Sequence, residues 1–246
     1  SCEGRNHTGH FHIIGRGMIL NTRPGFYQDR FHAAFAELGL PILDCPVLRP
    51  EATDAELPDP RAFDAVILTS QVAVAQFSAA GLWLSKKAYA VGPGTEEAAR
   101  MAGFGDVVCT GVDAADMEQY LADQPFEMAL YASAEDVAKD LSEVFPKRVR
   151  RLPVYRMVPL NEMPASVLSV VKANAQIIVP LFSRRSAETV TTLFGKAQVT
   201  ATNSRLYAVG ISHDIFAGTE GPWQCRAVAP SPTLEAMVAA TREVAA

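Results

Sequence analysis

Apolar and polar positions along the chain follow two patterns. Short continuous apolar runs, such as residues 65–68 and 177–181, are typical of strands covered by helices on both faces. Apolar residues spaced three and four apart, as in residues 26–38, predict amphipathic helices. The pattern predicts strands at 18–21, 41–48, 65–68, 88–91, 106–109, 128–131, 151–158, 176–181, 206–209 and 227–228, and helices at 26–38, 72–77, 96–101, 116–121, 134–144, 166–172, 187–194, 214–216 and 233–244. Strands that alternate with helices indicate parallel sheets.

One strand–helix–strand unit occurs twice, with matching positions about 110 residues apart. The segment Ala65–Ser70 matches Ile177–Ser183, and Ala88–Thr95 matches Leu206–Ser212. The strands that begin at Met18 and Met128 also correspond. Two copies of one unit predict an α/β fold of two similar lobes with parallel sheets, and an active-site cleft between the lobes.

Two strands that contain proline, residues 41–48 and 151–158, occupy equivalent positions in the repeat. Proline lacks the amide that a central strand must donate, so it favours edges and connections. We therefore expect residues 45–50 and 152–159 to form a two-stranded linker. The first lobe is then discontinuous, with residues 18–48 plus 160–246, and the second comprises residues 50–154. Residues 1–17 lack periodicity, and we expect a disordered leader or tag.

Composition narrows the classes of function. The formal net charge of −5 argues against nucleic acid as the main partner, although Arg148, Arg150 and Arg151 form a local basic cluster. The four cysteines are far apart, which indicates neither a disulfide framework nor a zinc site and fits a reducing cytoplasm. No apolar run approaches the roughly 18 residues of a membrane span. We expect a cytoplasmic protein with no metal and no membrane partner.

Candidate binding residues follow the apolar strands, where Ser, Thr or Gly precede helices. The first amides of a helix lack partners within the helix and attract carboxylates or phosphates, so such turns bind anions without basic side chains. The alternative for each turn alone is simple capping of its helix. The candidates of this kind are Ser70, Gly94, Thr95, Ser183, Ser186 and Ser212.

Other side chains at strand ends have two interpretations each. Thr22 and Arg23 end the first strand, where Arg23 would pair with a ligand carboxylate or lie on a solvated turn. His213 would titrate in the site or be an exposed residue of a turn. Tyr155, in the predicted linker, would direct its phenol into the cleft or pack within one lobe.

Nucleotide and hydrolase motifs are missing from the sequence. Gly92–Thr95 has neither the G-x-G-x-x-G pattern nor a G-K-[ST] ending, so it is a weak candidate for a nucleotide loop. No H-E-x-x-H, nucleophile elbow or kinase set occurs. These absences weigh against a nucleotide or sugar-phosphate enzyme.

Taken in order, the segments at these strand ends resemble the uroporphyrinogen-III synthase family over residues 18–246. The matching segments are Asn21–Pro24, Phe63–Ser70, Tyr89–Thr95, Pro153–Tyr155, Phe182–Ser183 with Ser186–Ala187, Ala208–Ser212 and Ala229–Leu234. The chain departs from the family pattern at Val72, where a polar residue is common, at Arg184, where proline is common, and at His213, where a small hydroxyl residue is common.

The resemblance implies an enzyme, a cofactor-free lyase of tetrapyrrole (heme) biosynthesis that dehydrates and cyclises hydroxymethylbilane with inversion of ring D. It also implies a catalytic role for Tyr155, in departure of the substrate hydroxyl, and cleft positions for Ser70, Thr95, Ser183 and Ser212. We expect a monomer that transiently contacts the preceding pathway enzyme. The rival hypothesis is a non-enzymatic two-lobe module that binds or senses a small anion.

Overall fold

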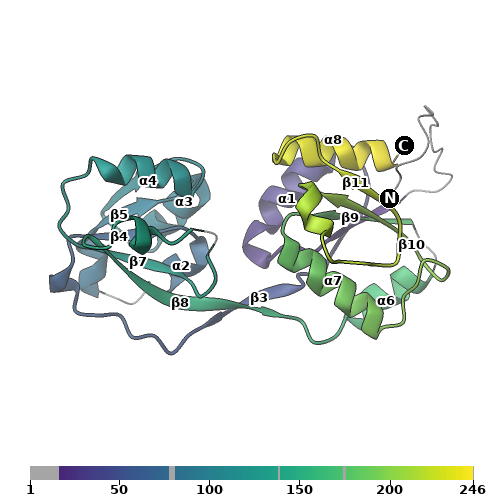
Figure 1. The fold of residues 1–246 in the computed structure, drawn as a ribbon, viewed down its shortest axis with the longest axis horizontal. Helices are drawn as coiled ribbons and strands as arrows, with labels where there is room; N and C mark the ends of the chain where they lie inside the picture. The colour runs from purple at the N-terminus through teal and green to yellow at the C-terminus, as the bar shows by residue number, and fades with distance from the viewer. Residues whose placement is uncertain (1–16, 78–80, 138, 174–175, 246) are drawn as a thin grey trace. The chain divides into compact units, whose positions relative to one another are not determined.

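The computed structural model describes residues 17–77, 81–137, 139–173 and 176–245. The described residues form two compact units (Figure 1). Unit 1 consists of the described residues within Ser1–Arg49 and Val158–Ala246, and unit 2 of those within Pro50–Met157. The leader or tag predicted for residues 1–17 lies outside the described residues, apart from Gly17.

Unit 1 has a parallel sheet of five strands in the order β11-β10-β9-β1-β2. The strands are β1 (Met18–Asn21), β2 (Ile42–Asp44), β9 (Gln176–Leu181), β10 (Arg205–Gly210) and β11 (Trp223–Val228). β9 and β1 are buried almost throughout because helices cover both faces of the sheet. β2, which follows Pro41, lies at one edge.

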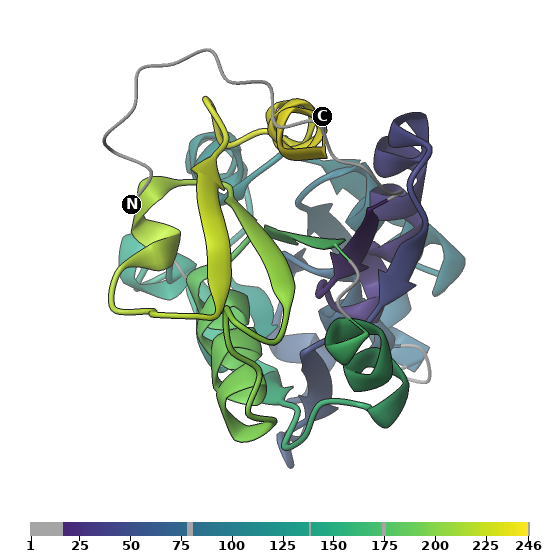
Figure 2. The same ribbon diagram turned by 90° about the vertical axis from the view of Figure 1, so that its right-hand side faces the viewer.

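Each face of this sheet is covered by its own set of helices (Figures 1 and 2). One face carries α1 (Gln28–Phe35), between the 3₁₀ turns η1 (Gly25–Tyr27) and η2 (Ala36–Leu38), and α8 (Leu234–Ala245). The other carries α6 (Ala165–Lys172), α7 (Arg184–Lys196) and the 3₁₀ turn η5 (His213–Phe216). The rings of Phe31 and Phe35, one helical turn apart, stack at 4.1 Å and are fully buried against β1 and β9. This pair supplies the apolar face that docks α1.

Unit 2 has a six-stranded sheet in the order β3-β8-β7-β4-β5-β6. The strands are β3 (Leu48–Ala52), β4 (Ala65–Leu68), β5 (Lys87–Ala90), β6 (Asp106–Cys109), β7 (Ala129–Ala134) and the long β8 (Val149–Pro159). β4 to β8 are parallel. β3 is antiparallel to β8. The backbone amide of Thr53 donates to the carbonyl of Val154, and the amide of Leu160 donates to the carbonyl of Val47.

Two apolar clusters cover the faces of this second sheet. α2 (Gln71–Ala75), α3 (Pro93–Met101) and the 3₁₀ turn η4 (Gly81–Ser85) contribute to the cluster around Phe77 and Trp83, which we call the α2/α3 face. α4 (Ala114–Ala122) and α5 (Leu141–Val144) contribute to the cluster around Tyr89 and Tyr131 on the opposite face. A further 3₁₀ turn, η3 (Pro60–Ala62), precedes β4.

The two sheets share one topology. Strands 11-10-9-1-2 of unit 1 correspond to strands 6-5-4-7-8 of unit 2, and both orders are doubly wound. The sequence copies have therefore exchanged halves, since unit 1 joins the first strands of one copy to the last strands of the other. The predicted fold class, two similar parallel α/β lobes joined by two strands, is confirmed.

Several predicted elements differ from the structure. The single strand expected at 41–48 is two strands, β2 and β3, and the strand expected at 227–228 is longer, β11. The helix expected at 134–144 is wrong except for α5. Arg151 binds the carbonyls of Ala134 and Glu135, and Asp140 caps α5 by accepting from Ser142. These contacts hold residues 134, 135 and 140 in a non-helical conformation.

Candidate functional site

In each unit, the candidate residues lie at the carboxyl edge of the parallel strands. In unit 1, Thr22 and Arg23 follow β1, Ser183 follows β9 and Ser212 follows β10. In unit 2, Ser70 follows β4 and Gly94 lies beyond β5. Because parallel strands end at the same edge, the structure gathers the candidates of each unit at one edge, where open α/β sheets bind ligands.

The point where strand order reverses is the preferred binding position in such sheets. In unit 1 the order reverses between β1 and β9, and in unit 2 between β7 and β4. Arg23 and Ser183 flank this point in unit 1, and Ser70 flanks it in unit 2. Thr69, the residue after β4, shares a side-chain hydrogen bond with Tyr131 of β7. Burial outweighs this bond and raises the pKa of the Tyr131 phenol.

Arg23 lies between two aromatic rings. Its guanidinium carbon is 4.1 Å from the ring centroid of Tyr27 and 4.3 Å from that of Phe182. Burial lowers the pKa of Arg23, but an arginine remains charged at neutral pH. Among the described residues, no carboxylate pairs with this half-buried cation. An oriented cation at the strand-order reversal is suited to bind an external anion.

Asn21 and Thr22 support this turn from within. Both are buried, at 0% and 1% exposure. The Asn21 amide donates to Asp44 at 2.7 Å and its oxygen accepts the backbone N–H of Arg23 at 3.1 Å. Thr22 is buried within this turn, and its carbonyl accepts a hydrogen bond from the backbone amide of Val47.

Ser183 and Ser186 form a hydroxyl pair at the start of α7, a helix of 13 residues. Ser183 Oγ accepts the Ser186 amide at 3.1 Å and donates to Ser186 Oγ at 2.9 Å. Ser183 is thus the helix cap that the alternative interpretation expected, and the residue is also exposed at the edge of the sheet. Capping uses one amide, and the dipole of a long helix still favours an anion at its first turn.

Ser70 and Thr95 occupy the corresponding turns of unit 2. Ser70 caps α2 by accepting the Ala73 amide at 3.2 Å, and Thr95 lies buried in the first turn of α3. A Cβ atom on Gly94 would lie 2.6 Å from the amide nitrogen of Gln71. The absence of a side chain at position 94 therefore lets the Gln71 side chain, from the start of α2, lie over the start of α3.

The turn after β10 is less suited to bind an anion. Ser212 precedes η5, which has only four residues, and its side chain makes no capping bond. His213 is exposed, as the alternative interpretation expected of a turn histidine. Arg184, where the family pattern has proline, is exposed and pairs with Glu188 at 2.8 Å.

Tyr155 lies level with Ser70 at the carboxyl edge of unit 2. The register pairs Leu68 with Ala132 and, two residues later, Ala134 with Tyr155. The Tyr155 side chain is 7% exposed and belongs to the α2/α3 face, to which Ser70 and Thr95 also bring their helices. The structure therefore places Tyr155 on the same face of unit 2 as both turns.

Sequence reasoning missed Gln71 and the contacts of Arg151. No sequence motif marks Gln71 as a site residue. Only its close approach to Gly94 in the structure does so. The sequence predicts a basic cluster that includes Arg151, whereas in the structure its guanidinium binds Ser133, Asp140 and backbone carbonyls. The only sequence signal was a charged residue inside a predicted strand.

Within the described residues, no group of three or more His, Cys, Asp or Glu side chains is arranged to hold a metal ion. None of the helices in this part of the chain has the length and apolarity needed to cross a membrane.

Comparison with known proteins gives one family match. The family model described as uroporphyrinogen-III synthase HemD matches residues 29–239. None of the curated proteins compared with the chain matches it significantly.

Two solved structures are similar to the chain. The uroporphyrinogen-III synthetase of Helicobacter pylori 26695 aligns with a TM-score of 0.60 at 16% identity, covering 93% of this chain and 99% of that one. A uroporphyrinogen III synthase of the extremely thermophilic bacterium Thermus thermophilus aligns with a TM-score of 0.38 at 17% identity, covering 92% of this chain and 96% of that one. The first of these likenesses shows the fold.

Proposed function

The chain belongs to the uroporphyrinogen-III synthase family, and we propose that it binds carboxylates of its substrate at the carboxyl edges of its parallel sheets. The reaction removes water from hydroxymethylbilane and closes the ring with inversion of ring D. The substrate carries eight carboxylates, so a protein of net charge −5 must bind it through local positive sites.

Arg23 carries this proposal. A half-buried guanidinium with aromatic rings on both sides and no acidic partner among the described residues has lost hydration without gaining an ion pair. A substrate carboxylate restores that partner, and a planar guanidinium binds a carboxylate through two parallel hydrogen bonds. The contacts of the guanidinium carbon with the Tyr27 and Phe182 rings restrain the cation at this position.

Helix ends supply further sites. The first turns of α7 and α3, marked by Ser183 with Ser186 and by Gly94 with Thr95, belong to helices of 13 and nine residues. Their amides and dipoles favour carboxylates. Ser70 and Ser212 precede shorter elements, and we assign them hydrogen bonds to the substrate rather than a dipole contribution. Thr22 supports the Arg23 turn.

Tyr155 is the proposed catalytic residue. Its phenol would donate a hydrogen bond or proton to the departing hydroxyl of the bilane, a general-acid role. Loss of that hydroxyl leaves an electrophilic azafulvene. Attack through the substituted carbon of ring D gives a spiro intermediate, which fragments and recloses with that ring inverted.

Positioning supplies most of the acceleration in this proposal. The bilane also closes unaided, without inversion, so the enzyme must bring its two ends together in the geometry that favours the substituted carbon. Several carboxylate contacts suit that task because each restrains one part of a flexible substrate. We further propose that the protein works as a cytoplasmic monomer with transient contact to the preceding pathway enzyme.

The decisive test supplies freshly generated hydroxymethylbilane and separates the porphyrin isomers after oxidation. We expect the type III isomer in excess over an enzyme-free control. Only type I product, at the rate of the control, would overturn the proposal. A second arm with the Arg23→Met variant shows whether substrate binding depends on that cation.

A further inference from the structure

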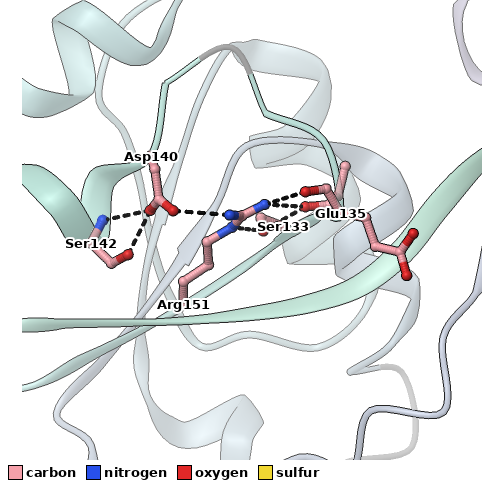
Figure 3. Close-up of polar contacts among 6 residues, drawn as sticks. Ser133, Glu135, Asp140, Ser142 and Arg151 are labelled. Carbon is pink, nitrogen blue, oxygen red and sulfur yellow. Dashed lines mark hydrogen bonds and ion pairs between the residues drawn. The ribbon is translucent and has the colours of Figure 1, made fainter.

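Arg151 makes more side-chain contacts at the end of β7 than any function assigned so far requires (Figure 3). Its Nε donates to Ser133 Oγ and its Nη1 to Asp140 Oδ2, each at 2.9 Å. Its Nη2 donates to the carbonyls of Ala134, at 2.9 Å, and Glu135. The guanidinium thus binds the last residues of β7 and, beyond them, the cap of α5.

Asp140 is held as firmly as Arg151. Its Oδ1 accepts the amide and the hydroxyl of Ser142, at 2.9 and 2.6 Å. Desolvation of the carboxylate opposes ionisation, but the bonds from Ser142 and Arg151 outweigh it, so the pKa of Asp140 is lowered. The side chains of Arg151 and Asp140 are only 21% and 17% exposed, which limits screening by solvent.

The same segment is bonded to Tyr155. The Glu135 amide donates to the Tyr155 carbonyl at 2.8 Å. The pairing of β7 with β8 changes register here, from Ser133 with Pro153 to Ala134 with Tyr155, so Val154 is an extra residue on β8. Such a bulge redirects the side chains that follow it.

The bulge determines the face on which Tyr155 lies. Arg151 pairs with Tyr131, which belongs to the face of α4 and α5. Side chains alternate along a strand, so an unbroken β8 would place Tyr155 on the Arg151 face, four residues later. Instead, Val154 and Tyr155 both belong to the α2/α3 face. Without the extra residue, Tyr155 would lie away from Ser70 and Thr95.

We propose that Arg151 is a positioning residue that holds the bulged register and thereby keeps Tyr155 on the α2/α3 face. The guanidinium fixes the carbonyls of Ala134 and Glu135, which lie where the register changes. A shift of one residue would turn the tyrosine to the opposite face. This inference rests on the proposed catalytic role of Tyr155.

The test combines Arg151→Met with Tyr155→Phe and measures kcat and KM with fresh hydroxymethylbilane. We expect each single variant to lower kcat about tenfold or more, with KM within about twofold. The double variant should lose no more than Tyr155→Phe alone, because Arg151 acts through that phenol. Losses that multiply in the double variant would overturn the inference.

Arg148→Met is the matched control. Arg148 also binds backbone carbonyls, those of Gln124 and Phe126, but it lies directly before β8, six residues from the bulge at Val154. It should reduce thermal stability as Arg151→Met does and leave kcat unchanged. Equal effects of the two variants on kcat would reduce Arg151 to a structural residue and overturn the inference.

Two further results separate the proposals. If Tyr155→Phe retains full kcat, the proposed role of the tyrosine fails, and with it the reason for positioning it. If Tyr155→Phe loses activity while a folded Arg151→Met does not, only the inference about Arg151 fails. Should Arg151→Met not fold, Arg151→Lys keeps a charge beside Asp140 but cannot reach all four acceptors, and it should show the same loss of kcat at unchanged KM.

Discussion

Replacing Arg23 with methionine tests how the substrate is bound. Methionine has a similar reach and still fills the space between Tyr27 and Phe182, but it carries no charge. A hydrogen bond to a charged group contributes about 1.5–3 kcal/mol. Because Arg23 is half-buried and solvent screens part of that interaction, we take the lower half of the range. Its loss should raise KM about 10- to 40-fold.

The contact is expected to exist in the ground state and the transition state alike, so kcat should change little. Arg23→Lys keeps the charge but loses the planar stacking and the paired hydrogen bonds, and its KM should be intermediate. The KM of the unmodified enzyme should increase with ionic strength, and that of Arg23→Met should increase less.

The assay measures type III and type I product at several concentrations of fresh bilane. At low substrate, Arg23→Met should give a larger type I fraction, since unaided closure competes with slow capture. Arg242→Met is the control, because Arg242 pairs with Glu37 and is 56% exposed on α8. Its KM should be unchanged.

A stability measurement separates binding from folding. Two cation–π contacts at a half-buried site contribute about 1–2 kcal/mol, which shifts Tm by only a few degrees in a chain of this size. A folded Arg23→Met enzyme whose KM stays within about twofold of the original at low salt would refute the carboxylate contact.

Three other predictions address single groups. Tyr155→Phe should lower kcat at least tenfold without abolishing type III product, because positioning remains; full activity would remove the phenol from the mechanism. The lowered pKa of Asp140 means that its contribution to stability is complete above the unfolded-state pKa of about 3.9 and is lost as pH falls through the lower folded-state value. The stability advantage over Asp140→Asn in urea should therefore decrease as the pH is lowered below the unfolded-state pKa, and an advantage unchanged by acid would contradict this. Burial raises the pKa of Cys45 to about 11. Iodoacetamide at about pH 8 should therefore leave Cys45 unmodified in the native protein and modify it after unfolding, which mass spectrometry of the peptide would show. Cys109, which is partly exposed, is the internal comparison.

Much of the fold was accessible from periodicity. Strands buried on both faces, such as β4 and β9, are continuous apolar runs, and their repetition predicted two similar lobes. Residues 134–144 were not accessible in this way, because Glu135, Lys139 and Glu143 are good helix formers by themselves. Contacts with Arg151, distant in sequence, override that local preference.

The residues of the candidate site likewise fall into those with a local sequence signal and those without one. Residues that follow strands, such as Ser70 and Ser183, were predicted because a strand end has a local signature. The position of Tyr155 in a strand was predicted too, but its face depends on the extra residue Val154, which alternation along one strand does not reveal. Gln71 approaches Gly94 only through the packing of α2 beside α3. Site residues that depend on contacts between elements were therefore missed.

The exchange of halves between the sequence copies affects the order of folding during synthesis. β1 ends at Asn21, yet its neighbour β9 begins at Gln176. At roughly 5–20 residues per second, the ribosome needs about ten to thirty seconds to supply that neighbour. Unit 2 is continuous in sequence and is completed during this interval. Phe31 and Phe35 meanwhile lack β9, one of the strands that bury them. Throughout the synthesis of unit 2, β1 therefore has only β2 of its two neighbouring strands, and this is the period in which a chaperone would have most effect.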